Sequence, residues 1–159
     1  MTGLPTGCPW EVADLLPHAE PAVLLDAVVA LDDMSLSATV TIGPRSPFRQ
    51  DNGVPAHVGI EYMAQACGAF SGARARRAGQ MPRLGFILGT RRYHASRAWF
   101  ADGERLVVTV NLVYLDEEVG VFDCVIRDGG DIVANAQLMV SEPKNVSEMV
   151  GRQGETDDG

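Results

Sequence analysis

The sequence predicts an α+β fold in which an antiparallel sheet wraps around one long central helix. Strand-like runs stand on both sides of a long proline-free segment, residues 56–78. That segment is rich in glycine and alanine. Only a buried helix tolerates several glycines, because each costs about 1 kcal/mol relative to alanine in helix propensity. Small side chains also let other backbones come close, so we expect the sheet to curl around this helix.

Two strands are expected before the helix. The run PAVLLDAVVAL, residues 21–31, is apolar and rich in β-branched residues, and the run LSATVTI, residues 36–42, alternates. The turn DDMS between them favours a hairpin. Residues 43–55 are dense in Gly, Pro, Asn and Asp, which predicts a loop. Pro55 then suits the first helical turn, where its missing N–H would have no partner in any case.

The helix is predicted to end at Gly79 and Pro82. Strand-like runs follow, with breaks at ADG, DEEVG and DGGD, and this pattern predicts a meander of three or four antiparallel strands. A chain of 159 residues with 46% hydrophobic content can build one core of ordinary size. We therefore predict a single domain over residues 1–142 and a disordered polar tail over residues 143–159.

The composition argues against several classes of function. A net charge of −8 disfavours nucleic-acid binding, which needs a basic surface. No apolar run is long enough to span a membrane and the N-terminus does not resemble a secretory signal, so a cytoplasmic protein without a membrane partner is expected. Three widely spaced cysteines without a CxxC pair indicate reduced thiols and no zinc site. No glycine spacing typical of a nucleotide loop occurs, and we expect no metal and no cofactor.

Arginines are concentrated in one segment of this acidic chain. Between residues 74 and 97 there are seven arginines and no Asp or Glu, out of 13 Lys and Arg in the whole chain. Two interpretations stay open. The cations either complement the dipole at the C-terminal end of the helix or form a docking patch for an acidic partner. The seven residues are Arg74, Arg76, Arg77, Arg83, Arg91, Arg92 and Arg97.

Three motifs, in this order and spacing, resemble those of one enzyme family. They are LLPHAEPAVLLDAVV, then VPAHVGIEYMAQACG at the start of the helix, then LGFILGTRRYHASRAWFADGERL. Together they resemble the hot-dog-fold 3-hydroxyacyl-[acyl-carrier-protein] dehydratases, and most closely the divergent dehydratase subunits found with aryl-polyene biosynthesis. The resemblance covers about residues 15–142 and implies a hot-dog fold.

The implied reaction is loss of water from a 3-hydroxyacyl thioester on acyl carrier protein, giving a trans-2-enoyl thioester in fatty-acid-like or aryl-polyene or polyketide synthesis. It needs a base, an acid for the leaving hydroxyl and donors for an enolate-like oxygen. In the family a glutamate at the position of Glu61 handles the hydroxyl. Burial in the helix would raise the pKa of Glu61 and suit it to an acid role. The backbone N–H groups of Ala56, His57 and Val58 are the expected donors.

One departure from the family concerns the base. The family places a catalytic histidine in the preceding loop, and the family's spacing from Glu61 falls on Pro47 and Phe48 of this chain. The loop SPFRQDNG contains no histidine. His57 lies one helical turn before Glu61, so both side chains leave the same face of the helix. His57 is therefore a candidate base, with a pocket-lining or helix-capping histidine as the alternative. His18 and His94 are better explained as a turn-stabilising residue and a strand surface residue.

Other residues of the motifs receive expected roles. Glu61 could alternatively be a structural buried carboxyl, but its EYMAQ context favours function. Gln65 lies one further turn along the helix face and could orient Glu61, or could face solvent. We expect substrate contacts from Ala56, Val58, Gln65 and Gly89. Met63, Cys67 and Phe70 are expected in the core.

Four functions stay open, in this order of preference. The first is a dehydratase whose carrier protein, bearing a phosphopantetheine-linked acyl group, docks on Arg74, Arg76, Arg77, Arg91 and Arg92. The second is a weak or inactive partner subunit of a dehydratase heterodimer, which the missing loop histidine motivates. A hot-dog acyl thioesterase and an acyl-binding module come next. Under all four we expect a homodimer or heterodimer, because a single curled sheet leaves an edge strand open.

Overall fold

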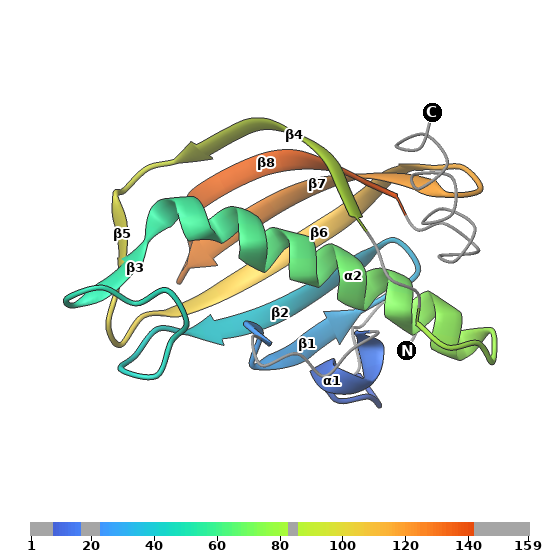
Figure 1. The fold of residues 1–159 in the computed structure, drawn as a ribbon, viewed down its shortest axis with the longest axis horizontal. Coiled ribbons are helices and arrows are strands. Elements are labelled where there is room, and N and C mark those ends of the chain that lie inside the picture. The colour runs from blue at the N-terminus through green and yellow to red at the C-terminus, as the bar shows by residue number, and fades with distance from the viewer. Residues whose placement is uncertain (1–7, 17–22, 83–85, 142–159) are drawn as a thin grey trace, which may run out of the picture.

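The computed structural model of the protein describes residues 8–16, 23–82 and 86–141. In chain order the elements are α1 (Val12–Leu15), β1 (Ala27–Leu31), β2 (Ser35–Thr41), β3 (Gly53–Pro55), the 3₁₀ turn η1 (Ala56–Val58), α2 (Gly59–Arg77), β4 (Phe86–Ala95), β5 (Trp99–Ala101), β6 (Arg105–Leu115), β7 (Val119–Asp128) and β8 (Asp131–Ser141). Figure 1 shows α2 running along the concave side of the sheet.

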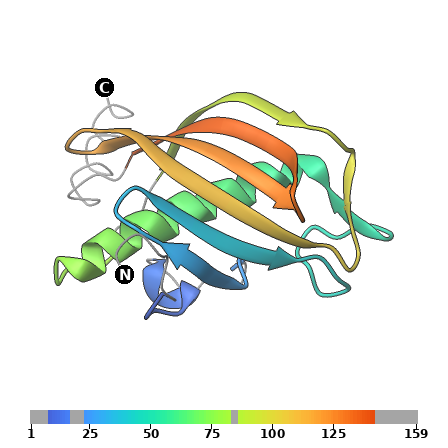
Figure 2. The same ribbon diagram turned by 180° about the vertical axis from the view of Figure 1, so that it is seen from behind.

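The main sheet has six strands in the order β1-β2-β6-β7-β8-β4, and all neighbouring pairs are antiparallel. Its strands cross in front of α2 in the view from behind in Figure 2. A second sheet contains only β3 and β5 and lies at the start of α2. The predicted architecture, an antiparallel sheet wrapped around one central helix, is confirmed.

Buried and less buried residues alternate along the strands, and the buried ones form the face of the sheet that packs on α2. In β6 the side chains of Leu106, Val108 and Val110 are fully buried. Successive side chains of a strand point to opposite faces, so the residues between them lie on the outer face of the sheet. The core that results includes two ring contacts, between Phe70 and Phe122 and between Tyr62 and Phe100. The predicted core residues Met63, Cys67 and Phe70 are all buried.

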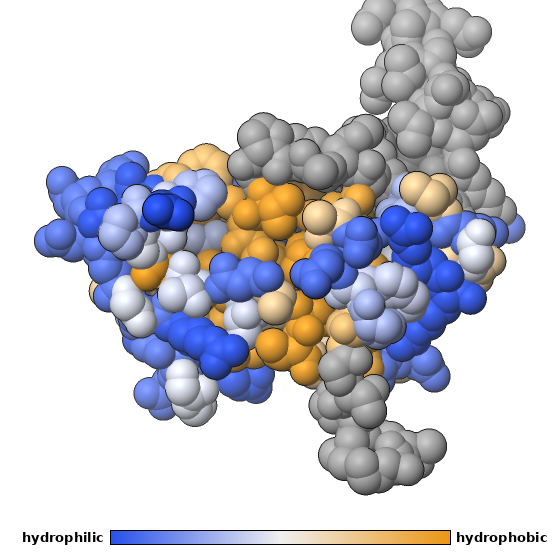
Figure 3. Space-filling model, turned by 90° about the horizontal axis from the view of Figure 1, so that it is seen from below, coloured by the Kyte–Doolittle hydropathy of each residue, from blue (hydrophilic) through white to orange (hydrophobic). Residues whose placement is uncertain are grey.

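Small residues of α2 allow neighbouring backbones to approach. A Cβ atom at Gly72 would overlap the carbonyl oxygen of Leu15, so α1 packs directly on the helix. Arg76 adds a hydrogen bond from its Nε to the carbonyl oxygen of Asp14 (3.0 Å). The side of the molecule on which α1 lies is drawn in Figure 3, where hydrophobic residues gather across the middle and hydrophilic residues lie at both ends. The helix ends at Arg77, and Gly79 just beyond it has a φ of 73°, which favours glycine.

The structure corrects the predicted strands in three places. β1 begins at Ala27, later than the predicted residue 21. The segment predicted as a loop over residues 43–55 contains β3, because Gly53–Pro55 pairs with β5. The predicted meander of three or four strands consists of the three strands β6, β7 and β8. β4 pairs with β8 at the far edge of the sheet, since the connection through β5 crosses the end of the sheet to reach β6.

Some predictions concern residues outside the described part of the chain. These are the tail after residue 142, His18, Arg83 and the beginning of the first predicted strand.

Candidate active site

The start of the central helix is held in place by the small sheet. β3 leads directly into η1, and the backbone N–H of Ala56 donates a hydrogen bond to the carbonyl oxygen of Ala98 (2.9 Å), which continues the ladder between β3 and β5. The amide of Ala56 is therefore engaged, and its predicted role as an oxyanion donor is wrong. The amides of His57 and Val58 remain in the first turn, whose N–H groups have no partner within the helix.

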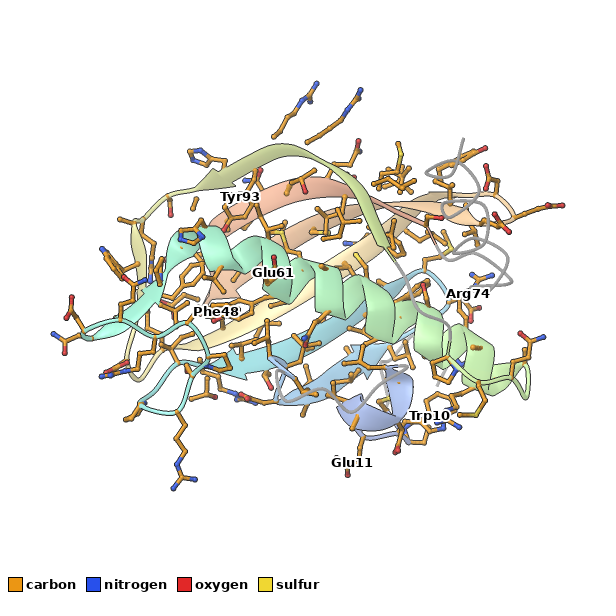
Figure 4. The ribbon with its side chains drawn as sticks, viewed as in Figure 1. Trp10, Glu11, Phe48, Glu61, Arg74 and Tyr93 are labelled. Carbon is orange, nitrogen blue, oxygen red and sulfur yellow. The ribbon has the colours of Figure 1, made fainter. Side chains whose placement is uncertain are left out.

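His57 and Glu61 lie at this end of α2, four residues apart. Both are exposed, whereas Tyr62 and Met63 beside them are buried. Figure 4 shows Glu61 on the side of the helix that faces β4. The expectation that Glu61 is buried is not met within this chain, because the sheet covers only part of the helix circumference and leaves the Glu61 face uncovered.

Tyr93 also lies at the helix start, although no motif in the sequence indicates it. Its hydroxyl donates a hydrogen bond to the carbonyl oxygen of Ala56, and a Cβ atom at Gly59 would overlap that hydroxyl. Burial raises the pKa of Tyr93 to about 12, so it stays a protonated donor at neutral pH. No local pattern could have found this contact, because it joins residues 37 positions apart.

The three remaining predicted substrate contacts lie in different surroundings. The side-chain oxygen of Gln65 accepts a hydrogen bond from the backbone N–H of Leu24 (2.8 Å), so this residue anchors the segment that leads into β1. Gly89 lies in β4 at an irregularity of the pairing with β8, and a Cβ atom there would meet nothing within 4 Å. Val58 is buried at the helix start.

The loop in which the family carries its histidine has an unusual backbone. Phe48 has a φ of 68° and its side chain is 55% exposed. A bulky residue rarely adopts this left-handed conformation. Arg49 next to it forms an ion pair with Asp102 (2.6 Å), which ties the loop to the turn after β5. Residues 43–52 of this loop include no histidine.

Comparison with known proteins identifies the family. The family model described as the ApeP dehydratase, ApeP-like, matches residues 10–151. The chain belongs to the ApeP dehydratase family. The resemblance to hot-dog dehydratases, and within them to the subunits of aryl-polyene biosynthesis, is thereby confirmed, and the chain is of the dehydratase type.

Two similar proteins support the membership of this chain in the ApeP dehydratase family. The dehydratase heterocomplex ApeI:P from Xenorhabdus doucetiae contains a chain 32% identical to this one, with a TM-score of 0.85 over 91% of this chain and 97% of that chain. The 3-hydroxyacyl-[acyl-carrier-protein] dehydratase FabZ of Proteus mirabilis (strain HI4320) is 28% identical over 144 residues, 86% of this chain and 93% of FabZ.

A more distant likeness concerns the fold alone. A hypothetical thioesterase with coenzyme A from Streptococcus pneumoniae TIGR4 is 14% identical to this ApeP-family chain. Its TM-score is 0.59 over 73% of this chain and 84% of that chain. The hot-dog fold that the sequence predicted is confirmed by these structures together.

The fold divides the arginine segment of this ApeP-family chain into two groups. Arg74, Arg76 and Arg77 lie in the last turn of α2, about 20 Å along the helix axis from Glu61 at 1.5 Å per residue. Arg91 and Arg92 lie on β4, where they line a hollow with Asp123 of β7 and Gln137 of β8 on the outer face of the sheet. The five arginines predicted to dock a carrier do not form one continuous patch.

The two groups also differ in their contacts. Arg77 pairs with Asp33 (3.3 Å), and the guanidinium of Arg74 stands 6.0 Å from the centre of the Phe70 ring. Arg91 and Arg92 are exposed, and within the described part of the chain neither forms an ion pair. An irregularity of the β4 pairing, with Arg92 at a φ of 55°, falls at this point.

His94 is an exposed residue of β4, as predicted. Cys8, Cys67 and Cys124 carry free thiols, and those of Cys67 and Cys124 lie 4.0 Å apart in the core. Among residues 8–16, 23–82 and 86–141, no three His, Cys, Asp or Glu side chains gather as a metal site would require. None of the helices in this part of the chain is long and apolar enough to cross a membrane.

Proposed function

We propose that this chain is a subunit of a hot-dog dehydratase that converts a 3-hydroxyacyl thioester on acyl carrier protein into the trans-2-enoyl thioester and water, in fatty-acid-like, aryl-polyene or polyketide synthesis. The observation that carries the proposal is the position of Glu61. In a member of the ApeP dehydratase family, this carboxyl stands at the start of the central helix, exposed, beside first-turn amides. FabZ, a similar protein, is named as acting on such carrier-bound substrates.

The chemistry assigns one role to each group. A base removes a proton from the carbon next to the thioester carbonyl, and the amides of His57 and Val58 stabilise the negative charge that moves onto the carbonyl oxygen. Glu61 then donates its proton to the leaving hydroxyl, which departs as water while the carbon–carbon double bond forms. His57 is the base that this chain offers at the helix start.

The exposure of Glu61 supports a second subunit at this face. A carboxyl can act as an acid near neutral pH when it is desolvated, and this chain leaves Glu61 uncovered. β4 ends the order of strands in the main sheet, and it exposes Ile87 and Leu88. An exposed apolar edge strand is a template for pairing with another chain. The partner is a second hot-dog subunit, either another copy or a different dehydratase chain, as in the ApeI:P heterocomplex.

The carrier protein is expected to dock beside the helix start. Acyl carrier proteins are acidic partners, and Arg91 and Arg92 offer two exposed cations on β4, the edge strand whose Tyr93 contacts the helix start. Arg74, Arg76 and Arg77 form a separate basic group at the other end of α2. Within this group Arg76 already donates a hydrogen bond to the carbonyl oxygen of Asp14, and Arg77 forms an ion pair with Asp33.

The test follows water loss by intact mass of a 3-hydroxyacyl carrier protein. The purified chain is incubated with this substrate alone, then with a second hot-dog dehydratase subunit from the same organism. We expect water loss, and we expect Glu61→Gln and His57→Ala to abolish it while circular dichroism shows an unchanged fold. Glu117→Gln, which removes an exposed carboxyl from the β6–β7 turn, is the matched control and should retain activity.

A weak or inactive partner subunit is the second candidate, and Pro47 in place of the family's histidine favours it. In that case no water is lost until the second subunit is added, and Glu61→Gln in this chain leaves the activity of the mixed complex nearly unchanged. A thioesterase would instead release free thiol from an acyl thioester without loss of water. Only the shared fold supports that reading.

A further inference from the structure

The carbonyl oxygen of Ala56 accepts two hydrogen bonds at the helix start. One comes from the backbone N–H of Gly59, within the first turn, and the other comes from the hydroxyl of Tyr93 on β4. A carbonyl oxygen has two lone pairs and can accept both. Because the N–H of Ala56 donates to the carbonyl oxygen of Ala98, the backbone of this residue is held at its N–H and at its carbonyl.

An irregularity in β4 turns Tyr93 toward the helix. The pairing with β8 shifts between Arg91 and His94, where β4 advances by three residues and β8 by two. Arg92 lies in this β-bulge, with a φ of 55° that is rare for a bulky residue. In a regular strand side chains alternate, and Tyr93 would share the outer face with Arg91. With the extra residue, Tyr93 instead packs against the hydrophobic core, while Arg91 and Arg92 are both exposed.

The oxygen that Tyr93 contacts belongs to the same peptide unit as the N–H of His57. This peptide bond is trans, and a trans peptide is planar, so its carbonyl and its N–H point in opposite directions. A hydrogen bond that fixes the Ala56 oxygen therefore also fixes the direction of the His57 N–H. It polarises the peptide as well, and hydrogen bonds linked in this way strengthen one another.

We propose that Tyr93 is a positioning residue for the dehydration: through the Ala56 carbonyl it aims and strengthens the His57 amide as a donor to the thioester carbonyl oxygen. This role rests on the proposed function, in which the amides of His57 and Val58 stabilise negative charge on that oxygen. Tyr93 acts from behind the peptide and does not itself touch the substrate. In Figure 4, Tyr93 and Glu61 lie at the same end of α2. The strained bulge at Arg92 thus serves to place the phenol there.

One test needs no turnover and follows the backbone amides of the full chain by NMR. Tyr93→Phe should shift the ¹⁵N signal of His57 upfield and leave that of Val58 nearly unchanged, because only the His57 N–H shares a peptide with the contacted oxygen. Tyr93→3-fluorotyrosine, which keeps the hydroxyl and makes it a stronger donor, should shift the His57 signal the opposite way. The control Tyr62→Phe removes a buried hydroxyl without a partner among the described residues and should shift neither signal.

Kinetics test the role in the reaction, with the chain assembled with its partner subunit and a short 3-hydroxyacyl thioester as substrate. Tyr93→Phe should lower kcat about tenfold at unchanged KM, because the His57 amide stabilises charge that develops only in the transition state. Tyr93→3-fluorotyrosine and Tyr62→Phe should not lower kcat.

The outcomes separate this role from the proposed function. A wild type that loses no water, alone or with the partner, overturns the proposed function and with it the catalytic role, even where the His57 signal responds as expected. An active wild type whose kcat is unaffected by Tyr93→Phe overturns the positioning role alone, also where the variant is less stable. A His57 signal that responds no more than that of Val58 does the same.

Discussion

The hydroxyl of Tyr93 on β4 donates a hydrogen bond to the carbonyl oxygen of Ala56, directly above Gly59. Figure 4 places Tyr93 over the first turn of the helix. This single contact joins the edge strand of the main sheet to the helix start that carries His57 and Glu61. Because the phenol is held against the backbone, the residue at position 59 must lack a side chain.

Gly59→Ala should therefore destabilise the protein. Its Cβ would overlap the Tyr93 hydroxyl and would lie 3.0 Å from Cδ1 of Ile126. Overpacking of this kind costs about 1–3 kcal/mol, which exceeds the gain in helix propensity of about 1 kcal/mol at most sites. Urea unfolding of Gly59→Ala, Tyr93→Phe and the double variant measures the coupling. The double variant should lose less stability than the sum of the single variants, and strict additivity would contradict the contact.

The free energy of unfolding should depend on pH above pH 10 because of two tyrosines, Tyr62 and Tyr93. The pKa values of Tyr62 and Tyr93 are each raised to about 12, whereas an unfolded tyrosine titrates near 10. Above pH 10 the unfolded chain loses these protons first, so the free energy of unfolding falls between pH 10 and 12. The expected loss is on the order of 2 kcal/mol for each tyrosine. Tyr62→Phe and Tyr93→Phe should each flatten this slope relative to the wild type in urea unfolding at a series of pH values. An unchanged slope in both variants would contradict the raised pKa values.

Two glycines of α2 should respond in opposite ways to alanine. At Gly72 a Cβ would overlap the carbonyl oxygen of Leu15, a backbone atom, so Gly72→Ala should displace α1 and cost about 1–3 kcal/mol. At Gly68 the nearest atom is Cδ2 of Leu16 at 3.5 Å, an ordinary contact. Gly68→Ala should therefore be neutral or stabilise the helix by up to about 1 kcal/mol. Thermal unfolding of the pair distinguishes them, and similar losses in both variants would show that α1 does not pack on α2 in this way.

The helix could be predicted from the sequence because its signals are local. Glycines and alanines, Pro55 at its start and Gly79 at its end all lie within or beside the segment, and the helix was found where expected. The neighbours of β4 and β5 could not be predicted in the same way. Strand pairing joins residues far apart along the chain, and nothing in the β4 segment shows that it pairs with β8 instead of β6.

The same reasoning explains what was found and missed at the candidate site. The spacing of His57 and Glu61 placed both residues at the helix start, where both are exposed. His57 lies in the 3₁₀ turn η1 and Glu61 in α2, so a shared face stays a prediction. Two hydrogen bonds at the helix start could not be predicted, from the Ala56 amide to Ala98 and from the Tyr93 hydroxyl to Ala56. Both depend on how β3, β5 and β4 meet at the helix start. The arginine segment is continuous only along the chain, because its first half lies in the last turn of α2 and Arg91 and Arg92 lie on β4.

The division of the arginines leads to a prediction for carrier recognition. The double reversal Arg91→Glu with Arg92→Glu should raise the Michaelis constant for carrier-bound substrate several-fold, because it replaces the two exposed cations of β4 with negative charges that repel the acidic carrier. A short thioester mimic, which lacks the carrier, should react as before. Steady-state kinetics on both substrates, at low and physiological salt, provides the measurement. Arg76→Glu with Arg77→Glu is the comparison at the far end of α2. A larger effect of that pair would move the docking site there.

The open edge of β4 leads to a prediction for assembly. Leu88 is 52% exposed on this edge strand, and Val113 is 53% exposed on β6, which has neighbours on both sides. Each can become lysine without burying a charge. If the partner subunit pairs along β4, Leu88→Lys should reduce the mass in sedimentation from that of two subunits to that of one, whereas Val113→Lys should leave it unchanged. Because pairing along β4 would also cover Glu61, Leu88→Lys should lower dehydration in parallel with the loss of the dimer. A dimer that survives Leu88→Lys but not Val113→Lys would place the interface on the outer face of the sheet, and Glu61 would then need another cover.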